Sequence, residues 1–263
     1  MRRSGPSTER LLAWALDPVL FALDCGLPDP DIHQQRILRS EAPQLGILAS
    51  RQFGKTEYTA NVALRTALLA AATLVLVLAR AQRQAIELLR RVSTQLAALG
   101  GLAPATLTVD NAQSLEFSNA SRIVSLPSTE ANIRGFSSPA LIAIDEAARV
   151  PDDLYHAVRP MLAIGRGRVI ALTSAWGKFG WFYGAWTEGG AQWERIEVRA
   201  DQCERFDPAW LAQERAALGE RIFRREYLCE FGDVDESVFA ADLVDRAFDN
   251  DLEPVFPGGV FGR

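Results

Sequence analysis

Residues 47–56 read Ile-Leu-Ala-Ser-Arg-Gln-Phe-Gly-Lys-Thr, and this stretch decides the fold of the chain. Its apolar start predicts a short strand, its middle predicts a tight loop, and a helical pattern continues from residue 57 to about residue 71. This order is typical of a phosphate-binding loop, because the loop amides and the positive end of the helix attract an anion. The predicted contacts to a bound nucleotide are Ser50, Arg51, Gln52, Phe53, Gly54, Lys55 and Thr56.

Three residues close this loop, and each would have a chemical role at a nucleotide. Gly54 leaves no Cβ in the way of a phosphate, Lys55 can reach the β- and γ-phosphates, and the Thr56 hydroxyl can ligate Mg²⁺. The match to G-x-x-x-x-G-K-[ST] is incomplete, because Ala49 stands at the first glycine and Arg51 lies inside the loop. An ordinary strand-to-helix turn with an exposed lysine and a surface arginine also fits these residues alone.

Length and composition indicate one large α/β domain, alone or with a small appendage. The chain has 263 residues, 48% of them hydrophobic, and a net charge of −5, which supports a full core and argues against a broad basic surface. Contact with DNA would then come from a local patch, a ring of copies or a region outside this chain. Three distant cysteines and two histidines form no zinc pattern, and we expect no membrane span and no secretory signal. These features favour a reducing cytoplasm.

Strands and helices are predicted to alternate along the chain. Continuous apolar runs such as residues 73–79 predict strands buried on both faces, as in parallel sheets. We therefore predict an α/β fold with a mainly parallel central sheet covered by helices on both sides. The other expected elements are helical residues 8–22 with a break at Pro18, a short helix capped by Asp31, a helix at 82–99, a hairpin of strands at 114–117 and 122–126, strands at 141–144 and 168–173, and a helix at 151–162.

Two acids follow the predicted strand at residues 141–144. At that edge of the sheet, Asp145 could hold Mg²⁺ through water beside Thr56, and Glu146 could polarise the attacking water as a general base. A pair of acids that merely caps the next helix is the alternative. The distance of about 90 residues from Gly-Lys-Thr, and the second buried strand, favour the catalytic interpretation.

Two further pairs of polar residues are candidates for nucleotide contacts. Thr173 and Ser174 end the strand at 168–173, where their hydroxyl groups could sense the γ-phosphate or only satisfy the strand end. Gln34 or Gln35 lies just upstream of the loop and could read adenine, because an amide both donates and accepts hydrogen bonds. A solvated glutamine on a helix is the alternative for either residue.

An arginine and an aromatic segment complete the candidates. Arg134 precedes Gly135 in a predicted loop shortly before the acid-bearing strand, and could reach a neighbouring subunit's γ-phosphate as an arginine finger or form a surface ion pair. Residues 176–186 carry six aromatic side chains. We expect these side chains to pack in the core, and stacking on nucleic-acid bases is the alternative.

Together these residues resemble the ATPase domain of the large terminase subunit, the DNA-packaging motor of tailed bacteriophages and prophages. The family's loop often lacks the first glycine and reads Ser-Arg-Gln-x-Gly-Lys-Thr, as residues 50–56 do here. The acids after residues 142–144, the run Thr173-Ser174-Ala175, the set Gln34, Ile37 and Leu38, and Arg134-Gly135 look like the family's acid pair, coupling motif, adenine motif and arginine finger. Residues 223–231 resemble the start of the linker that follows such ATPase domains.

The resemblance implies a fold, ligands and partners. The fold would be a RecA-like (ASCE) P-loop NTPase sandwich, with ATP and Mg²⁺ at the site and with Glu146, Arg134, Lys55 and Arg51 acting in catalysis. Residues 1–232 would form the ATPase domain and residues 233–263 the start of the linker. Full-length members continue into a nuclease domain, for which this chain has no room, so we expect no DNA cleavage. The implied partners are double-stranded DNA, a portal protein, a small terminase subunit and further copies in a ring, in the bacterial host cytoplasm.

Two other functions fit the same sequence. A nucleotide-binding remnant that no longer hydrolyses ATP would act as a scaffold or be the relic of a decayed prophage. Another RecA-like ATPase of nucleic-acid metabolism, such as a helicase, is the second alternative, although the length leaves no space for a second such domain. The first would bind ATP without turnover, and the second would separate strands.

Overall fold

A central eight-stranded sheet organises the computed structural model, which describes residues 5–127 and 135–232. The strand order is β3-β4-β5-β2-β6-β7-β1-β8. Neighbouring strands from β5 to β8 run parallel, whereas β4 is antiparallel to both β3 and β5. The strands are β1 (Gln44–Ala49), β2 (Leu74–Ala79), β3 (Leu107–Asp110), β4 (Ser114–Phe117), β5 (Arg122–Pro127), β6 (Leu141–Asp145), β7 (Arg168–Thr173) and β8 (Trp193–Val198). The predicted α/β fold with a mainly parallel sheet is confirmed.

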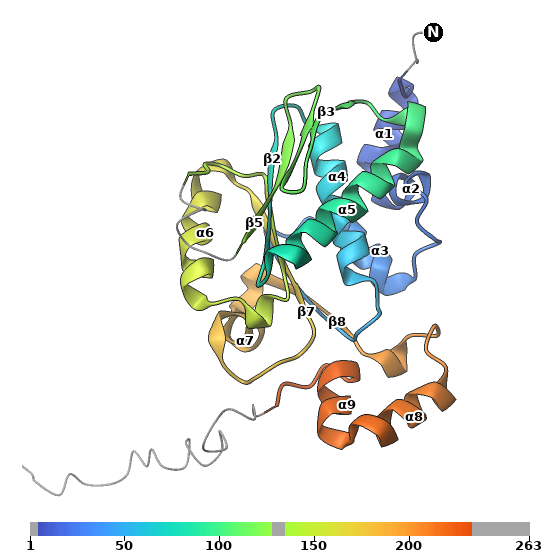
Figure 1. The fold of residues 1–263 in the computed structure, drawn as a ribbon, viewed down its shortest axis with the longest axis vertical. Coiled ribbons are helices and arrows are strands. Elements are labelled where there is room, and N and C mark those ends of the chain that lie inside the picture. Colours follow the sequence, from blue (N-terminus) through green and yellow to red (C-terminus); the bar gives the residue numbers. More distant parts are fainter. Residues whose placement is uncertain (1–4, 128–134, 233–263) are drawn as a thin grey trace, which may run out of the picture.

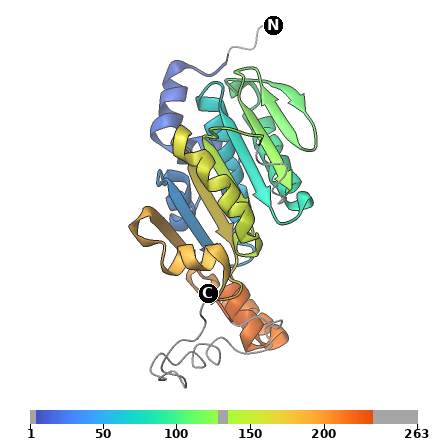
Figure 2. The ribbon, with the colours of Figure 1, turned by 90° about the vertical axis from the view of Figure 1, so that its left-hand side faces the viewer.

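Helices cover both faces of this sheet, as Figures 1 and 2 show. One face carries α1 (Thr8–Leu16), α2 (Pro18–Asp24), α3 (Ile32–Arg39), α4 (Lys55–Leu69) and α5 (Gln82–Leu99), and the other carries α6 (Asp152–Gly165) and α7 (Gly180–Thr187). Two more helices, α8 (Pro208–Leu218) and α9 (Glu220–Tyr227), pack together below the sheet in Figure 1. None of the helices in the described ranges is long and apolar enough to cross a membrane.

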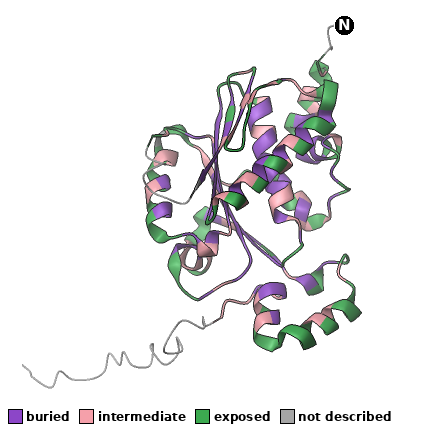
Figure 3. Cartoon of the chain, in the orientation of Figure 1, coloured by how far each residue is buried: buried purple, intermediate pink, exposed green. Residues whose placement is uncertain are grey.

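The core has two halves, one on each face of the sheet. In β2, Val75 and Val77 belong to the half under α1–α5, whereas Leu76 and Leu78 belong to the half under α6 and α7. Successive strand residues point to opposite faces, so a strand that is covered twice must be apolar throughout. Figure 3 shows the resulting buried layer along the strands. This is why the unbroken apolar run at 73–79 correctly predicts an inner strand.

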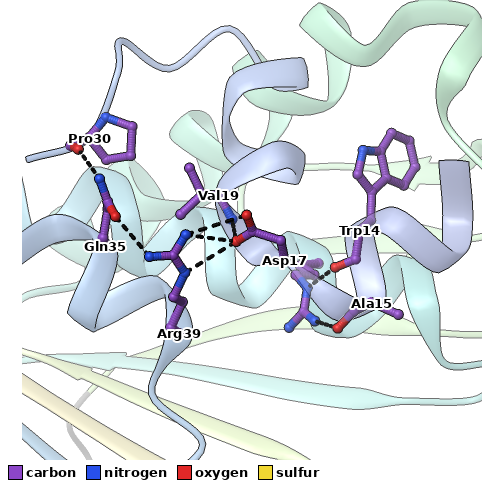
Figure 4. A network of polar contacts seen from close by, with 8 residues as sticks. Trp14, Ala15, Asp17, Val19, Pro30, Gln35 and Arg39 are labelled. Atoms are coloured by element: carbon purple, nitrogen blue, oxygen red, sulfur yellow. Dashed lines mark hydrogen bonds and ion pairs between the residues drawn. The ribbon is translucent and has the colours of Figure 1, made fainter. Parts of the chain in front are cut away.

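Polar contacts fasten the N-terminal helices to the domain. Pro18 begins α2 after the break that the sequence predicts, and Asp17 caps this helix at the Val19 amide, 3.1 Å away. The Arg39 guanidinium donates to Asp17 from α3, with an Nε–Oδ1 distance of 3.2 Å, and also to the Gln35 amide oxygen (Figure 4). The Arg39 hydrogen bond lowers the pKa of Asp17. These bonds hold α2 against the helix that precedes the loop at 50–54.

All three cysteines are buried thiols. Burial raises the pKa of Cys25 and Cys229 to about 12, and it raises that of Cys203 as well. The Cys229 thiol lies 3.3 Å from the Val198 carbonyl oxygen and 3.6 Å from that of Leu48. The segment after α9 is thereby attached to the ends of β8 and β1.

Candidate nucleotide-binding site

The loop at residues 50–54 connects β1 to α4, as predicted from the sequence. Gln52 and Gly54 both have left-handed backbone conformations, with φ of 63° and 94°. Glycine adopts this conformation without the steric cost that other residues meet. A Cβ on Gly54 would find ordinary contacts only, so the local requirement for glycine here is conformational. Phe53 is fully buried and anchors the loop to the core.

The loop is also fastened to distant parts of the chain. The Ser50 amide donates to the Val198 carbonyl at 2.9 Å, and the Arg51 amide donates to the Glu226 carbonyl at 3.0 Å. The Arg205 guanidinium donates to the Phe53 carbonyl at 2.8 Å. The loop is therefore held in place by β8, by α9 and by the segment between them, none of which adjoins it in the sequence.

Lysine, threonine, serine and the two acids meet at the carboxyl ends of the parallel strands. Lys55 Nζ lies 3.1 Å from Ser174 Oγ, and Thr56 Oγ1 lies 3.5 Å from Asp145 Oδ2. Both Lys55 and Asp145 are buried. The strand order β6-β7-β1 explains this meeting. Asp145 ends β6, Ser174 follows β7, and Lys55 and Thr56 begin α4 after the loop that leaves β1. The predicted convergence of the loop and the acid pair is thus present in the structure.

Asp145 is a buried carboxyl group with a perturbed pKa. Burial, followed by the neighbouring Glu146 charge, raises the pKa of this carboxyl group to about 6, although Lys55 and the hydrogen bonds from the Glu146 amide and Thr56 partly offset the rise. The Glu146 amide donates to Asp145 Oδ1 at 2.9 Å. Thr56 and Asp145 offer a hydroxyl and a carboxylate oxygen, the hard donors that Mg²⁺ takes together with phosphate oxygens and water. The donor set therefore fits a Mg²⁺ ion that a nucleotide would bring.

Glu146 stands in a strained backbone conformation at the end of β6, with φ of 52° and ψ of 44°. A residue other than glycine held in this region costs about 1 kcal/mol or more, and such residues gather at functional sites. A 3₁₀ turn, Ala147–Arg149, follows at once, so the acid is not the cap of a regular helix. Its half-buried side chain lines the cleft that the loop forms.

That cleft has a volume of about 250 Å³ and is lined by Arg51, Gln52, Gly54, Lys55, Thr56, Glu57, Arg91, Glu146 and Ser174. Two of these residues, Glu57 and Arg91, are not among the site residues that the sequence predicts. Arg91 of α5 forms an ion pair with Glu57 of α4, and Gln95 Nε2 donates to Glu57 Oε1 at 2.8 Å. Glu57 and Arg91 are 34 residues apart and belong to no common sequence motif. They meet because α4 packs on α5.

Gln34 lies against the loop, but its amide is engaged inside the protein. Its oxygen accepts from the Asp31 amide at 2.9 Å in a capping box, and its nitrogen donates to the Phe53 carbonyl at 3.3 Å. The Gln35 amide bonds to the Pro30 carbonyl and to Arg39 (Figure 4). Neither glutamine lines the cleft, so contact with adenine by Gln34 stays a prediction.

Thr173 and Ser174 have different surroundings despite being adjacent. Ser174 faces Lys55, whereas the buried Thr173 hydroxyl donates to the Ser174 carbonyl at 2.8 Å and accepts from the Ala148 amide at 3.4 Å. Thr173 therefore connects the end of β7 to the turn after Glu146. Ser174 is the member of the pair that lines the cleft.

The remaining predicted residues have mixed outcomes. Arg51 is largely exposed at the mouth of the cleft, with its Nε 3.7 Å from a Glu226 carboxylate oxygen. Within the aromatic segment, Trp181 and Phe182 are buried, and Trp181 stacks on Tyr155 with ring centroids 4.1 Å apart. Core packing is thus confirmed for these two side chains, whereas it is wrong for Phe179, which is exposed. Arg134 and residues 233–263 lie outside the described residues.

One known protein family matches most of this chain, including the loop and the acid pair. The family model for the terminase large subunit, T4likevirus-type, N-terminal, matches residues 47–246. The chain belongs to this large terminase subunit family.

Solved structures share the fold of this terminase chain. The large terminase ATPase domain of Thermus phage P74-26 has a TM-score of 0.71 and 19% identity, covering 87% of this chain and 99% of that one. The large terminase of another thermophilic bacteriophage has a TM-score of 0.65 and 11% identity, covering 76% of this chain and 53% of that one. The bacteriophage HK97 large terminase has a TM-score of 0.61 and 17% identity, covering 85% and 55%. This chain therefore spans about half the length of the whole large terminases, and its fold is that of terminase ATPase domains.

Proposed function

We propose that the chain is a Mg²⁺-dependent ATPase that drives double-stranded viral DNA into a procapsid. The observation that carries this proposal is the meeting of Lys55 and Ser174 with Thr56 and Asp145 at one edge of the sheet. Family membership supports a packaging motor, and a related large terminase from a thermophilic bacteriophage has been solved in complex with ADP and with ATP-γ-S. Nucleotide, Mg²⁺ and DNA are accordingly the ligands of the proposed activity.

Five residues in and beside the cleft have roles in the proposed hydrolysis. Lys55 would neutralise the phosphates, and Glu146 would accept a proton from the attacking water as its oxygen bonds to the γ-phosphorus. The bond from that phosphorus to the bridging oxygen breaks, and ADP retains this oxygen. Thr56 and Asp145 would hold the Mg²⁺ ion, which draws charge from the β- and γ-phosphates. Arg51 would add positive charge at the mouth of the cleft.

The proposed activity also requires that several copies of the chain assemble into a ring. Arg134 would act as an arginine finger in a neighbouring copy, so activity would require a ring, and the portal protein, the small terminase subunit and double-stranded DNA would be its partners in the host cytoplasm. Arginine fingers raise hydrolysis rates by about 10³-fold or more. Activity per subunit should then rise with protein concentration, and a flat value would contradict the role of Arg134.

The test is steady-state phosphate release by the wild type, by Glu146→Gln and by the matched control Glu188→Gln, which changes an exposed acid outside the cleft. We expect turnover in the wild type and the control and its loss in Glu146→Gln. Absence of turnover in all three proteins, at concentrations that allow assembly, would contradict the proposal. Binding of ATP by calorimetry without turnover would favour a nucleotide-binding remnant, and strand separation would favour a helicase.

A further inference from the structure

A second cavity adjoins the nucleotide cleft. It has a volume of about 400 Å³ and shares three lining residues with the cleft, namely Arg51, Glu146 and Ser174. Its other walls come from the start of α5 and from the turn after Glu146. In the sheet register, Ala79 at the end of β2 pairs with Asp145, so the start of α5 is next to the acid pair. The cavity thus adjoins the side of the cleft that carries Glu146 and Ser174.

The walls of this cavity carry an excess of positive charge. Among the residues that the structure describes, Arg51, Arg83 and Arg149 line it against two carboxylates, Glu146 and Glu226, and Arg80, which is not counted toward this excess, lines it as well. Glu226 is buried, and its carboxylate is already shared, because it lies 3.2 Å from Arg225, 3.7 Å from Arg51 and 4.0 Å from Arg149. One carboxylate divided among three guanidinium groups leaves the wall positive.

Arg149 has a donor that the protein does not use. Its Nε is buried and has no hydrogen-bond partner among the residues that the structure describes. Its guanidinium lies 3.9 Å from the centre of the Trp176 ring, which stabilises the cation. This Nε has almost no exposed surface, whereas the side chain as a whole is 30% exposed and lines the cavity. An anion in the cavity would therefore be attracted by the charge of the Arg149 guanidinium group rather than by this buried donor.

The start of α5 supplies the opposite wall. Arg83 lies in the first turn of this 18-residue helix and is exposed, without an ion-pair partner within the described ranges. The positive end of a helix favours an anion. Guanidinium groups also match the geometry of phosphate oxygens.

We propose that this cavity binds the inorganic phosphate cleaved from ATP before the phosphate leaves the protein. The inference rests on the proposed function. The shared walls place the cavity directly beside the cleft, and the hydrogen phosphate ion brings two negative charges with acceptor oxygens for the guanidinium groups of Arg83 and Arg149. A phosphate of the DNA backbone has related chemistry, but a backbone phosphate would have to enter from outside rather than from the cleft.

The test is calorimetric titration of inorganic phosphate into the full chain saturated with Mg²⁺ and ADP. We expect phosphate to bind the wild type, and Arg83→Gln to weaken this binding about five- to tenfold with unchanged affinity for ADP. The matched control is Arg90→Gln, an exposed arginine further along α5 that does not line the cavity. Arg149→Lys is a second variant, which keeps the charge but loses the planar guanidinium fork that matches phosphate oxygens, and it should also weaken binding.

Three results would overturn the inference. Equal phosphate affinity in the wild type, Arg83→Gln and Arg149→Lys would show that the ion binds elsewhere. Competition between phosphate and ADP would place the ion in the cleft itself. A loss of affinity for duplex DNA in Arg83→Gln, with unchanged affinity for phosphate, would assign the cavity to the DNA backbone. Phosphate binding in a protein that never hydrolyses ATP would instead contradict the proposed function and leave the cavity assignment intact.

Discussion

Lys55 and Ser174 are 119 positions apart in the chain, yet Lys55 Nζ donates a hydrogen bond to Ser174 Oγ at 3.1 Å. The contact connects the start of α4 to the residue after β7 and gives the buried ammonium group a hydrogen-bond acceptor. We expect Ser174→Ala to lower the free energy of unfolding of the nucleotide-free protein by about 1–2 kcal/mol, because it removes this acceptor. A phosphate would replace the lost acceptor, so Mg²⁺-ATP should still bind.

Urea unfolding with and without Mg²⁺-ATP measures both effects. Lys55→Ala is the contrasting variant and should lose nucleotide binding. Equal loss of ATP affinity in the two variants would assign Ser174 a direct role at the phosphate rather than a supporting role at the lysine.

The stability of the nucleotide-free protein should depend on pH through Asp145. Its pKa is raised to about 6 in the folded state, above the value of about 4 in the unfolded chain. The folded state therefore binds the proton more tightly, and the contribution of Asp145 to stability is fully present below pH of about 4 and is lost as the pH rises through about 6. Asp145→Asn removes this dependence and should be more stable than the wild type at pH 8 by about 1–3 kcal/mol.

Chemical denaturation at pH 4 and pH 8 without Mg²⁺ checks this prediction. The difference between the two proteins should shrink at the lower pH. A constant difference across the range would mean that Asp145 does not titrate within it. The stabilised variant should also fail to hydrolyse ATP, because it lacks the carboxylate for Mg²⁺.

Glu226 should contribute more to stability than an exposed acid of the same region. It is buried among Arg51, Arg149 and Arg225, and Glu226→Gln would leave these guanidinium groups without their shared counter-charge. We expect the free energy of unfolding to fall by about 1–3 kcal/mol. This is less than for a fully buried ion pair, because Arg51 is largely exposed to solvent. Glu230→Gln, which breaks the exposed pair with Arg224, should cost less than about 1 kcal/mol. Thermal unfolding compares the two, and similar losses would contradict the prediction.

Thr173→Val keeps the shape of the side chain but removes the hydroxyl between the Ser174 carbonyl and the Ala148 amide. The turn after Glu146 then loses its hydrogen bond to β7. We expect kcat to fall about tenfold with KM nearly unchanged, because the base is misplaced while the phosphate contacts remain. Thr173→Ser restores the hydroxyl and should recover most of the rate. Equal rates in all three proteins would exclude a positioning role for Thr173.

The preference of the enzyme for ATP over GTP tests the role of Gln34. If Gln34 contacts adenine, Gln34→Ala should narrow the ratio of kcat/KM for ATP over GTP. If its amide only joins the Asp31 cap to the Phe53 carbonyl, the variant should lose about 1–2 kcal/mol of stability with the ratio unchanged. Gln35→Ala is the matched control, since its amide bonds on the other side of α3 to Pro30 and Arg39.

The sequence predicts two kinds of element well. These are strands that are buried on both faces and therefore form continuous apolar runs, and helices whose apolar residues recur with the helical period. The helix at 82–99 and the strand at 168–173 have the predicted bounds, and the hairpin pairs Leu115 with Ile123 as expected. Strand β8 is missed because Trp-Glu-Arg-Ile-Glu-Val lies at the edge of the sheet and carries three charged residues among its apolar ones. No apolar run marks such a strand.

The candidate site is predictable where one short segment supplies its chemistry, as residues 50–56 and 145–146 do. Arg91, Glu57 and Glu226 are missed because their roles follow from how α5, α4 and α9 pack around the loop. Nothing in the local spacing of these residues distinguishes them from ordinary surface charges. Helix packing, rather than sequence pattern, therefore determines the outer part of the site.

The burial of Cys25, Cys203 and Cys229 has a practical consequence for labelling this protein with fluorescent dyes. Thiol-reactive dyes attack the thiolate, and these three side chains are both inaccessible and poorly ionised at neutral pH. A single cysteine introduced on an exposed face of α8 should therefore take a fluorophore selectively in the otherwise unaltered protein. Single-molecule recordings could then begin without first building a cysteine-free background.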